Sequence, residues 1–359
     1  MVYLGVDLHR NISHVVALDG VGEVILERRF GNSAHEFQRV FGELEPEPIE
    51  VAFEATYGWS WFAELLADAG IEAHKAHPLA TKAISSGRVK NDAVDARTLA
   101  HLLRTNLLPE AWIAPPDVRE ARRLVRMRVS LVRMRSRLKA QVHALCADAG
   151  VPVPVSDLFG KAGRELLGGL ALRPTSAGRL AASLRLIDDL GREIVEADRE
   201  LVRLYREDDR IRRLTPIPGI GFLTATTIIA EVGDVGRFSS PERLTSWAGL
   251  TPTERSSADH TRRGHISKQG SRWLRWAMVE GQRESAELRT CTASPTRSPT
   301  GGAARSPESL SRGDCSRSPS TPSATLRAAG HTRRCIAHLI RSGRARCVSW
   351  PQLDGRSLD

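Results

Sequence analysis

The segment Val2-Tyr3-Leu4-Gly5-Val6-Asp7 opens the chain as a short apolar run that ends on an acid. Ile12–Leu18 and Glu23–Phe30 then alternate apolar and polar residues on either side of the sequence Asp-Gly-Val-Gly at positions 19–22. Alternation with a period of two predicts β-strands, and a glycine-containing turn between them predicts that they pair. We therefore expect the chain to begin with three antiparallel strands.

Further along, the pattern changes from strands alone to strands mixed with helices. Ile49–Glu54 is a second apolar run that ends on an acid, and Ile71–His77 is a third strand. Helices are expected from the N-cap Ser33 to about Leu44, and over Trp59–Ala69. Strands followed by alternating helices and strands predict an α/β domain with a mixed sheet.

Four acids occupy positions where such a domain performs chemistry. Asp7 and Glu54 end apolar strands, and acids at the carboxyl ends of neighbouring strands face the crevice of the sheet. Asp92 and Asp95 lie three residues apart in Lys90-Asn91-Asp92-Ala93-Val94-Asp95-Ala96-Arg97, the predicted start of a helix, so they share one helix face. Four uncompensated carboxylates repel one another, whereas one or two Mg²⁺ ions satisfy them. The sequence therefore predicts a magnesium site.

Each acid also has a simpler interpretation. Asp92 and Asp95 fit a solvated helix face on which Lys90 and Arg97 neutralise them, Asp7 fits a residue that starts a turn, and Glu54 fits a solvent contact at a strand end. The occurrence of all these placements in one chain favours the metal site.

The composition limits the class of protein. The 359 residues are enough for two sizeable cores, and the formal net charge of +10 indicates a polyanionic partner, nucleic acid before membrane. No apolar run reaches the roughly 20 residues of a membrane span. Cys146 is the only cysteine before Cys291, which argues against a disulfide framework in the main body. We expect a cytoplasmic protein.

A long basic helix is predicted from Asp117 to about Gly150. Leucines recur every seven residues there, as in a coiled-coil seam, at Leu124, Leu131, Leu138 and Leu145. Its many arginines have few neighbouring acids, which favours a face that follows DNA phosphates over a plain solvated surface; among them are Arg126, Arg133 and Arg137. After a Pro- and Gly-containing connector, a second periodic helix over about Ser176–Arg206 predicts an antiparallel coiled-coil hairpin.

A second domain is predicted to begin near Leu214. The turn Pro218-Gly219-Ile220-Gly221 opens a helix over Phe222–Glu231, which is typical of half of a helix-hairpin-helix. In that motif, backbone N–H groups near Gly219 and Gly221 hold a DNA phosphate. The alternative is an ordinary glycine-rich helix entry. Ser240 is expected to cap a further helix that ends at Trp247.

Two sets of motifs resemble one family. Leu4-Gly5-Val6-Asp7, Phe53-Glu54-Ala55-Thr56, His77-Pro78 and the segment from Lys90 to Ala96 resemble the DEDD domain of IS110-type insertion-sequence transposases. Gly249-Leu250-Thr251-Pro252, Gly264-His265-Ile266-Ser267-Lys268-Gln269-Gly270 and Leu274-Arg275 resemble the C-terminal domain of that family. The resemblance implies a RuvC-like RNase H fold in which Asp7, Glu54, Asp92 and Asp95 bind Mg²⁺ beside scissile DNA.

The same resemblance implies a covalent serine intermediate. Counting from Pro252 and back from Gly264 places the family's nucleophile at Ser257, with Ser256 as the alternative, and Ala258 follows where the family has Gly. A serine needs a proton acceptor and charge stabilisation to attack a phosphate. Arg262, Arg263 and Lys268 are candidates for that stabilisation, and Lys90 is a candidate nucleic-acid contact. The family also implies DNA ends and target as partners, an element-encoded guide RNA, and a dimer or tetramer.

We expect four regions. Residues 1–112 form the DEDD RuvC-like domain, 113–210 the coiled-coil spacer, 211–285 the mainly helical serine domain, and 286–359 a low-complexity tail. The tail is rich in Ser, Pro, Arg and Thr and carries no apolar period. It is either a disordered basic extension or unrelated sequence introduced by a frameshift.

Three other functions stay open from the sequence. A RuvC-like nuclease needs the four acids and no serine. A degenerate copy that only binds nucleic acid needs neither. An actin-like ATPase shares the Gly-x-Asp strand end but needs a second glycine-rich phosphate loop, which the sequence lacks.

Overall fold

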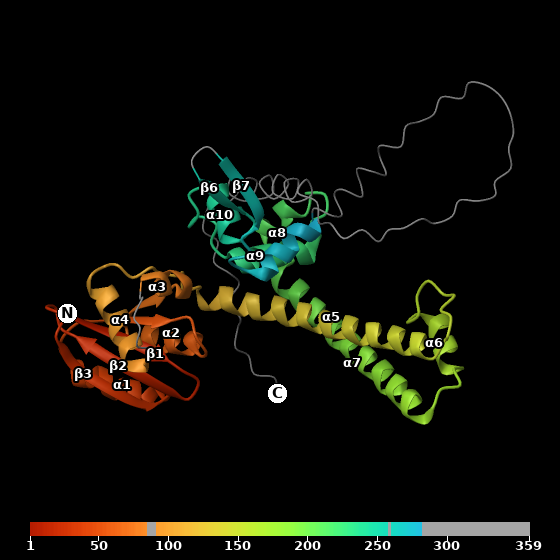
Figure 1. The fold of residues 1–359 in the computed structure, drawn as a ribbon, viewed down its shortest axis with the longest axis horizontal. Coiled ribbons are helices and arrows are strands. Elements are labelled where there is room, and N and C mark those ends of the chain that lie inside the picture. The colour runs from red at the N-terminus through yellow and green to blue at the C-terminus, as the bar shows by residue number, and fades with distance from the viewer. Residues whose placement is uncertain (85–90, 258–259, 282–359) are drawn as a thin grey trace, which may run out of the picture. The chain divides into compact units, whose positions relative to one another are not determined.

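The computed structural model describes residues 1–84, 91–257 and 260–281, and for residues 255–257 and 260–263 it describes the backbone alone. Its internal contacts divide the chain into two compact units, Met1–Ala114 and the part that begins at Pro115 (Figure 1). In the part of the chain that the structure describes, we find no helix with the length and apolar character to cross a membrane. The predicted tail, residues 286–359, lies outside the described residues.

Unit 1 is built on a five-stranded sheet with the strand order β3-β2-β1-β4-β5. Its central strand β1 pairs with β2 in antiparallel and with β4 in parallel orientation, and β5 adds in parallel to β4. The strands are β1 (Val2–Leu8), β2 (Ile12–Leu18), β3 (Val24–Gly31), β4 (Ile49–Glu54) and β5 (Glu72–Ala76). This confirms the predicted mixed α/β sheet and matches an RNase H-like DEDD fold.

Helices cover both faces of this sheet. Helices α1 (Ala34–Leu44) and α2 (Trp59–Asp68) close one face over an aromatic core, in which Phe62 lies 4.6 Å from Phe37 and 5.2 Å from Phe53 between ring centroids. Ser33 accepts a hydrogen bond from the Glu36 amide as the N-cap of α1, as predicted. Helix α4 (Asp92–Arg104) packs on the other face, and the short helix α3 (Pro78–Ile84) was not predicted.

Two long helices dominate unit 2 and run side by side in Figure 1, α5 (Pro116–Asp148) and α7 (Pro174–Tyr205). They are antiparallel, because Arg128 of α5 pairs with Asp198 while Cys146, near the end of α5, packs with Leu180. On α7, every seventh residue is buried, at Leu180, Ile187, Ile194 and Leu201. On α5, the predicted leucines are half-buried, and the fully buried positions include Val118, Val125, Val129 and Val142.

The connector between these helices contains α6 (Lys161–Gly168), which the sequence analysis did not predict. Beyond α7 come α8 (Asp209–Leu214), α9 (Phe222–Val232), α10 (Pro241–Trp247) and a helix over residues 272–281. Between the last two helices lies a hairpin of β6 (Pro252–Ser257) and β7 (His260–Ile266). The region is mainly helical, as expected, but the hairpin was not predicted. Apart from Pro252, Gly264 and Ile266 both strands are polar, so the apolar alternation that marks a strand is missing.

Candidate metal centre and nucleic-acid interface

Asp7 lies near the carboxyl end of the central strand and is only 9% exposed. Burial raises the pKa of Asp7 above its ordinary value. The nearby His9 imidazole opposes this rise, and the charges of Asp92 and Asp95 add to it. The charges of Asp92 and Asp95 therefore both act on Asp7, which places three of the four predicted ligands near one another.

Helix α4 carries Asp92 and Asp95 in its first turn, and a side-chain cap fixes that turn. The Asn91 side chain accepts a hydrogen bond from the Val94 amide at 2.8 Å, and both acids lie in the first turn of the helix. Carboxylates are favoured there, because the amino end of a helix carries partial positive charge. The cap and the helix dipole therefore hold two like charges together at the start of α4.

Close contact between α4 and β1 sets the distance of these acids from Asp7. A Cβ atom on Gly5 would lie 1.9 Å from the Ala96 carbonyl oxygen and 2.7 Å from the Ala100 nitrogen. Only glycine lets the helix backbone come this close to the strand. Gly5 precedes Asp7 by two residues and therefore lies on the same face of the sheet.

Glu54 ends β4, the parallel neighbour of β1. The register pairs Val6 with Phe53, so Glu54 stands level with Asp7 on the adjacent strand. Thr56 donates a hydrogen bond from its Oγ1 to the Leu8 carbonyl oxygen at 2.5 Å, which ties the loop after β4 to the end of β1. Glu54 is half-buried and engages other groups of the protein. The fourth predicted acid therefore lies at the same end of the sheet.

His9 joins this cluster, although the sequence analysis did not single it out. Its Nε2 atom lies 3.1 Å from Asp7 Oδ2 and 3.4 Å from Asp92 Oδ1. Among the described residues, Asp7, His9 and Asp92 form the group whose ligand atoms all lie within 4.8 Å of one another. Glu54 and Asp95 are not part of this closest group. The sequence offered one signal, a histidine two residues after the strand-end acid.

The competing interpretation is a helix face on which Lys90 and Arg97 neutralise Asp92 and Asp95. Arg97 pairs with Glu27 of β3 at 2.9 Å and therefore anchors α4 to the sheet edge. Lys90 lies outside the described residues. Asp7 is buried, Glu54 and Asp92 are half-buried and Asp95 is exposed, and such a set of carboxylate oxygens suits a hard divalent cation. The residues present therefore fit a divalent metal.

Ser257 stands at the tip of the β6–β7 hairpin. The register places it opposite His260, and Arg255 opposite Arg262, with the turn residues 258 and 259 outside the described chain. The side chains of Ser256, Ser257, Arg262 and Arg263 also lie outside the described set, so the structure fixes their backbone positions alone. The predicted nucleophile therefore occupies the far end of a two-stranded arm.

The base of this arm is held by the residues of the C-terminal motifs. The Lys268 amide donates to the Gly249 carbonyl oxygen at 3.0 Å, and Arg275 donates from one nitrogen to the carbonyl oxygens of Ala248 and Gly270, each at 3.1 Å. Gly249 has a φ of 69°, and a Cβ atom there would meet the Gln269 backbone at 2.2 Å. These motif residues therefore fix the arm to the helix over residues 272–281.

The arginines of α5 are more heavily paired than the sequence suggested. Arg126 makes a two-bond ion pair with Glu231 of α9, at 2.7 and 2.8 Å, and Glu231 is 1% exposed. Arg128 pairs with Asp198 in the same manner. The expectation that few acids offset these arginines was wrong, because the acids come from α7 and α9, far away in sequence.

Two predicted arginines remain on the surface. Arg133 is exposed and lies over the Trp273 ring, 4.4 Å from its centroid. Arg137 is exposed on α5. Arg122 donates to the carbonyl oxygens of Ala230 and Glu231, and burial lowers its pKa to about 10. Arg122 is therefore held inside unit 2, whereas the side chains of Arg133 and Arg137 reach solvent.

The predicted phosphate-binding turn lies between α8 and α9. Gly219 has a φ of 83°, and Gly221 is the N-cap of α9 with no side-chain cap bond, so the first amides of the helix are not used by a capping side chain. Lys268, with a φ of 56°, is exposed at the end of the hairpin.

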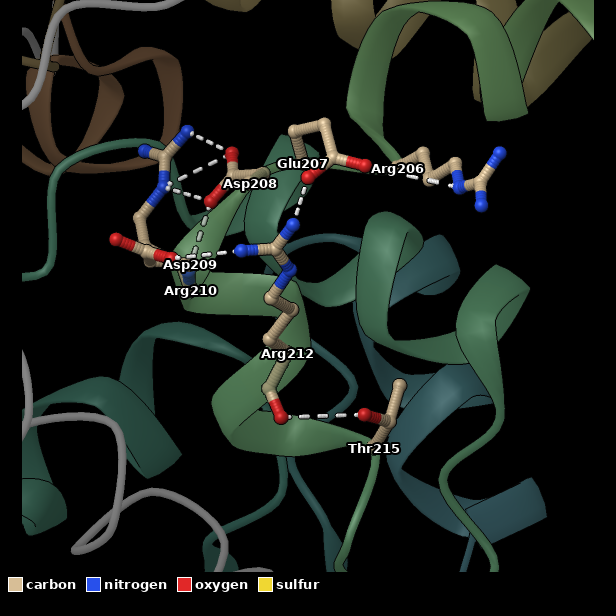
Figure 2. Close-up of polar contacts among 7 residues, drawn as sticks. All are labelled: Arg206, Glu207, Asp208, Asp209, Arg210, Arg212 and Thr215. Atoms are coloured by element: carbon tan, nitrogen blue, oxygen red, sulfur yellow. Dashed lines mark hydrogen bonds and ion pairs between the residues drawn. The ribbon is translucent and has the colours of Figure 1, made fainter.

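Ion pairs fix the junction that leads into this turn (Figure 2). Asp208 caps α8 by accepting from the Arg210 amide at 2.8 Å and pairs with the Arg210 side chain at 2.6 Å. Arg212 bridges Glu207 and Asp209, and Arg206 lies beside Glu207 at 3.6 Å. The charged side chains of this junction therefore pair with one another.

The fold and the acid cluster together define a DEDD-type domain that processes nucleic acid, joined to a basic helical unit. Comparison with known proteins agrees. A transposase family model for the DEDD domain of IS110-type elements matches residues 4–149, and the model described as "Transposase IS116/IS110/IS902 family" matches residues 211–294. The chain belongs to the IS110-type family of insertion-sequence transposases, and is a DNA transposase.

Individual relatives span most of the chain. The transposase for insertion sequence element IS1328 of Yersinia enterocolitica is 25% identical over 77% of this chain and 81% of its own length. The transposase for element IS1111A of Coxiella burnetii is 25% identical over 78% and 76% respectively. A Pseudomonas aeruginosa protein named "Probable family 20 transposase" is 26% identical over 80% and 84%.

Proposed function

We propose that this transposase cuts and rejoins DNA through a serine–DNA covalent intermediate, with Mg²⁺ held by the acids of unit 1. The observation that carries the proposal is the geometry around Asp7: His9 Nε2 lies 3.1 Å from Asp7 and 3.4 Å from Asp92, and Asp95 shares the first turn of α4 with Asp92. A DEDD transposase domain implies a divalent metal, and an all-oxygen carboxylate set favours Mg²⁺.

Asp7, Asp92, Asp95 and Glu54 would hold the metal. When bound, it supplies charge stabilisation to a phosphodiester under attack. The protein's own part is positional: β1 and β4 present Asp7 and Glu54 level with each other, and the close contact at Gly5 sets the helix that carries the other two acids.

Ser257 is proposed as the nucleophile. Its Oγ attacks the phosphorus of a phosphodiester, its proton passes to a base, and one deoxyribose oxygen leaves and takes up a proton. The phosphate is then a diester of serine and DNA, so a free DNA hydroxyl can reverse the reaction on a new strand without any further energy source. The hairpin arm supports this proposal, because the register places the Ser257 backbone in the pair of residues next to the turn.

The partners proposed are the element's DNA ends, the target DNA and a structured guide RNA encoded by the element. The net charge of +10 and the exposed Arg133, Arg137 and Lys268 support contacts with polyanions. The antiparallel helices α5 and α7 support a coiled-coil spacer, through which we propose that two or four copies assemble.

Trapping of a protein–DNA adduct tests this function. Full-length protein is incubated with Mg²⁺, element-end DNA and flanking element RNA, and is then separated on a denaturing gel. We expect a shifted, protease-sensitive band that is lost in Ser257→Ala and in Asp92→Ala but kept in Ser256→Ala.

The same gel separates the competing functions. Metal-dependent cleavage without an adduct, unchanged in Ser257→Ala, would show a RuvC-like nuclease. An adduct that persists in Ser257→Ala and disappears in Ser256→Ala would move the nucleophile by one residue. Salt-sensitive binding with neither cleavage nor adduct would show a copy that only holds nucleic acid.

A further inference from the structure

His9 stands where a metal ligand would stand. Its Nε2 atom is 3.1 Å from one oxygen of Asp7 and 3.4 Å from one oxygen of Asp92. Neighbouring ligands of one octahedral ion with bonds of about 2.1 Å lie about 3 Å apart. The nitrogen is therefore about as far from each oxygen as two neighbouring ligands of a single cation would be, and the ligand atoms of the three residues all lie within 4.8 Å of one another.

The turn that carries His9 is fixed by hydrogen bonds. The His9 amide donates to the Ile12 carbonyl oxygen at 3.1 Å, and the Asn32 side chain donates to the His9 carbonyl oxygen at 2.6 Å. Asn32 in turn accepts from the fully buried Ser13 hydroxyl at 2.7 Å. These bonds fix the backbone of His9, whereas its side chain is 53% exposed.

We propose that His9 supplies a nitrogen ligand to the metal of unit 1 and so sets its metal preference. The inference rests on the proposed metal site and adds to it a residue outside the four acids. Imidazole binds first-row transition ions better than it binds Mg²⁺, whereas carboxylates suit Mg²⁺. A site that includes His9 therefore binds Mn²⁺ more tightly than a site made of the four acids alone.

An alternative role of His9 predicts the opposite change in metal affinity when the side chain is removed. If His9 serves only as a cationic partner of Asp7 and Asp92, it competes with the metal, and its removal strengthens metal binding. As a ligand, its removal weakens binding. The sign of the change in affinity therefore decides between the two roles.

The test uses the full-length protein and Mn²⁺ as the probe. Titration followed by electron paramagnetic resonance gives the affinity, and electron spin echo modulation of the bound Mn²⁺ detects a directly bonded ¹⁴N nucleus. We expect ¹⁴N modulation in the wild type and its loss in His9→Ala, with Mn²⁺ affinity at least tenfold lower. Mg²⁺ affinity, measured by competition, changes less.

His35→Ala is the matched control, because His35 also lies beside a carboxylate, 3.9 Å from Glu36, but is 84% exposed on α1. It should retain both the modulation and the affinity. Bound Mn²⁺ without ¹⁴N modulation in the wild type, or tighter binding by His9→Ala, would overturn the ligand role and leave the acid site intact. Failure of the wild type to bind Mn²⁺ at all would instead overturn the proposed metal site.

Discussion

Replacement of Gly5 by alanine tests how the acid cluster is assembled. The new Cβ atom would lie 1.9 Å from the Ala96 carbonyl oxygen and 2.7 Å from the Ala100 nitrogen, both backbone atoms of α4. No rotamer change relieves contacts with backbone. The helix must therefore move away from β1, taking Asp92 and Asp95 with it.

The expected magnitude follows from this overlap. Relief of the contact requires a shift of about 1 Å or more, and displacements of that size at a reacting centre cost roughly 100-fold in rate. Overpacking in a close-packed interior costs about 1–3 kcal/mol of unfolding free energy. Gly5→Ala should therefore lower stability moderately and weaken metal binding and strand cleavage severely.

Urea unfolding and Mn²⁺ titration of the full-length protein measure both effects. Gly42→Ala is the matched control, because Gly42 lies in α1 with no atom within 4 Å of the position of an added Cβ. That change should stabilise the helix by about 0.5–1 kcal/mol and leave metal binding unchanged. If Gly5→Ala binds Mn²⁺ with wild-type affinity, the close approach of α4 does not assemble the site.

Three further predictions concern single side chains. Glu231→Gln removes the buried charged partner of Arg126, whose own side chain is 42% exposed, and should cost about 1–3 kcal/mol in urea unfolding. Glu120→Gln, on an exposed pair, should cost under about 1 kcal/mol, and equal losses would refute the buried network. Arg137→Ala should weaken DNA binding equally for all sequences and reduce the slope of log affinity against log salt by about 1; an unchanged slope would exclude a phosphate contact. Burial, followed by the charges of nearby arginines, lowers the pKa of His101 below its ordinary value, so the unfolded chain takes up a proton more readily than the folded chain. The free energy of unfolding should therefore fall as the pH drops below about 6.5. His101→Gln should lessen that fall, measured as the difference between urea midpoints at pH 7.5 and 5.5.

The strands and most helices of unit 1 were predictable because their signals are local. Ile49–Glu54 is an apolar run of strand length, and the structure gives β4 the same bounds. Ser33 and Asn91 are side-chain caps that mark helix starts in the sequence. The mixed character of the sheet followed from the switch between alternating strands and strand–helix units, whereas the strand order was not predicted.

The partners of the basic residues were not predictable, because pairing depends on contacts across long stretches of chain. Arg126 and Glu231 are 105 residues apart, and only the fold brings them together. One signal was present, since Glu231 is the single charged residue in the apolar helix Phe222–Val232. An acid buried in such a helix must find a partner.

The hairpin escaped prediction for a different reason. Its strands carry no apolar face, so neither a period of two nor a helical period appears in residues 252–266. His9 was missed because a histidine beside a strand-end acid has many possible roles, and only the fold sets its distance from Asp92.

Anomalous diffraction from crystals grown with Mn²⁺ tests the central claim most directly, because it locates the metal without reference to activity. The account predicts a manganese peak bonded to oxygens of Asp7 and Asp92. A strong peak elsewhere, with none beside Asp7, would show that the four acids do not form the metal centre of this transposase.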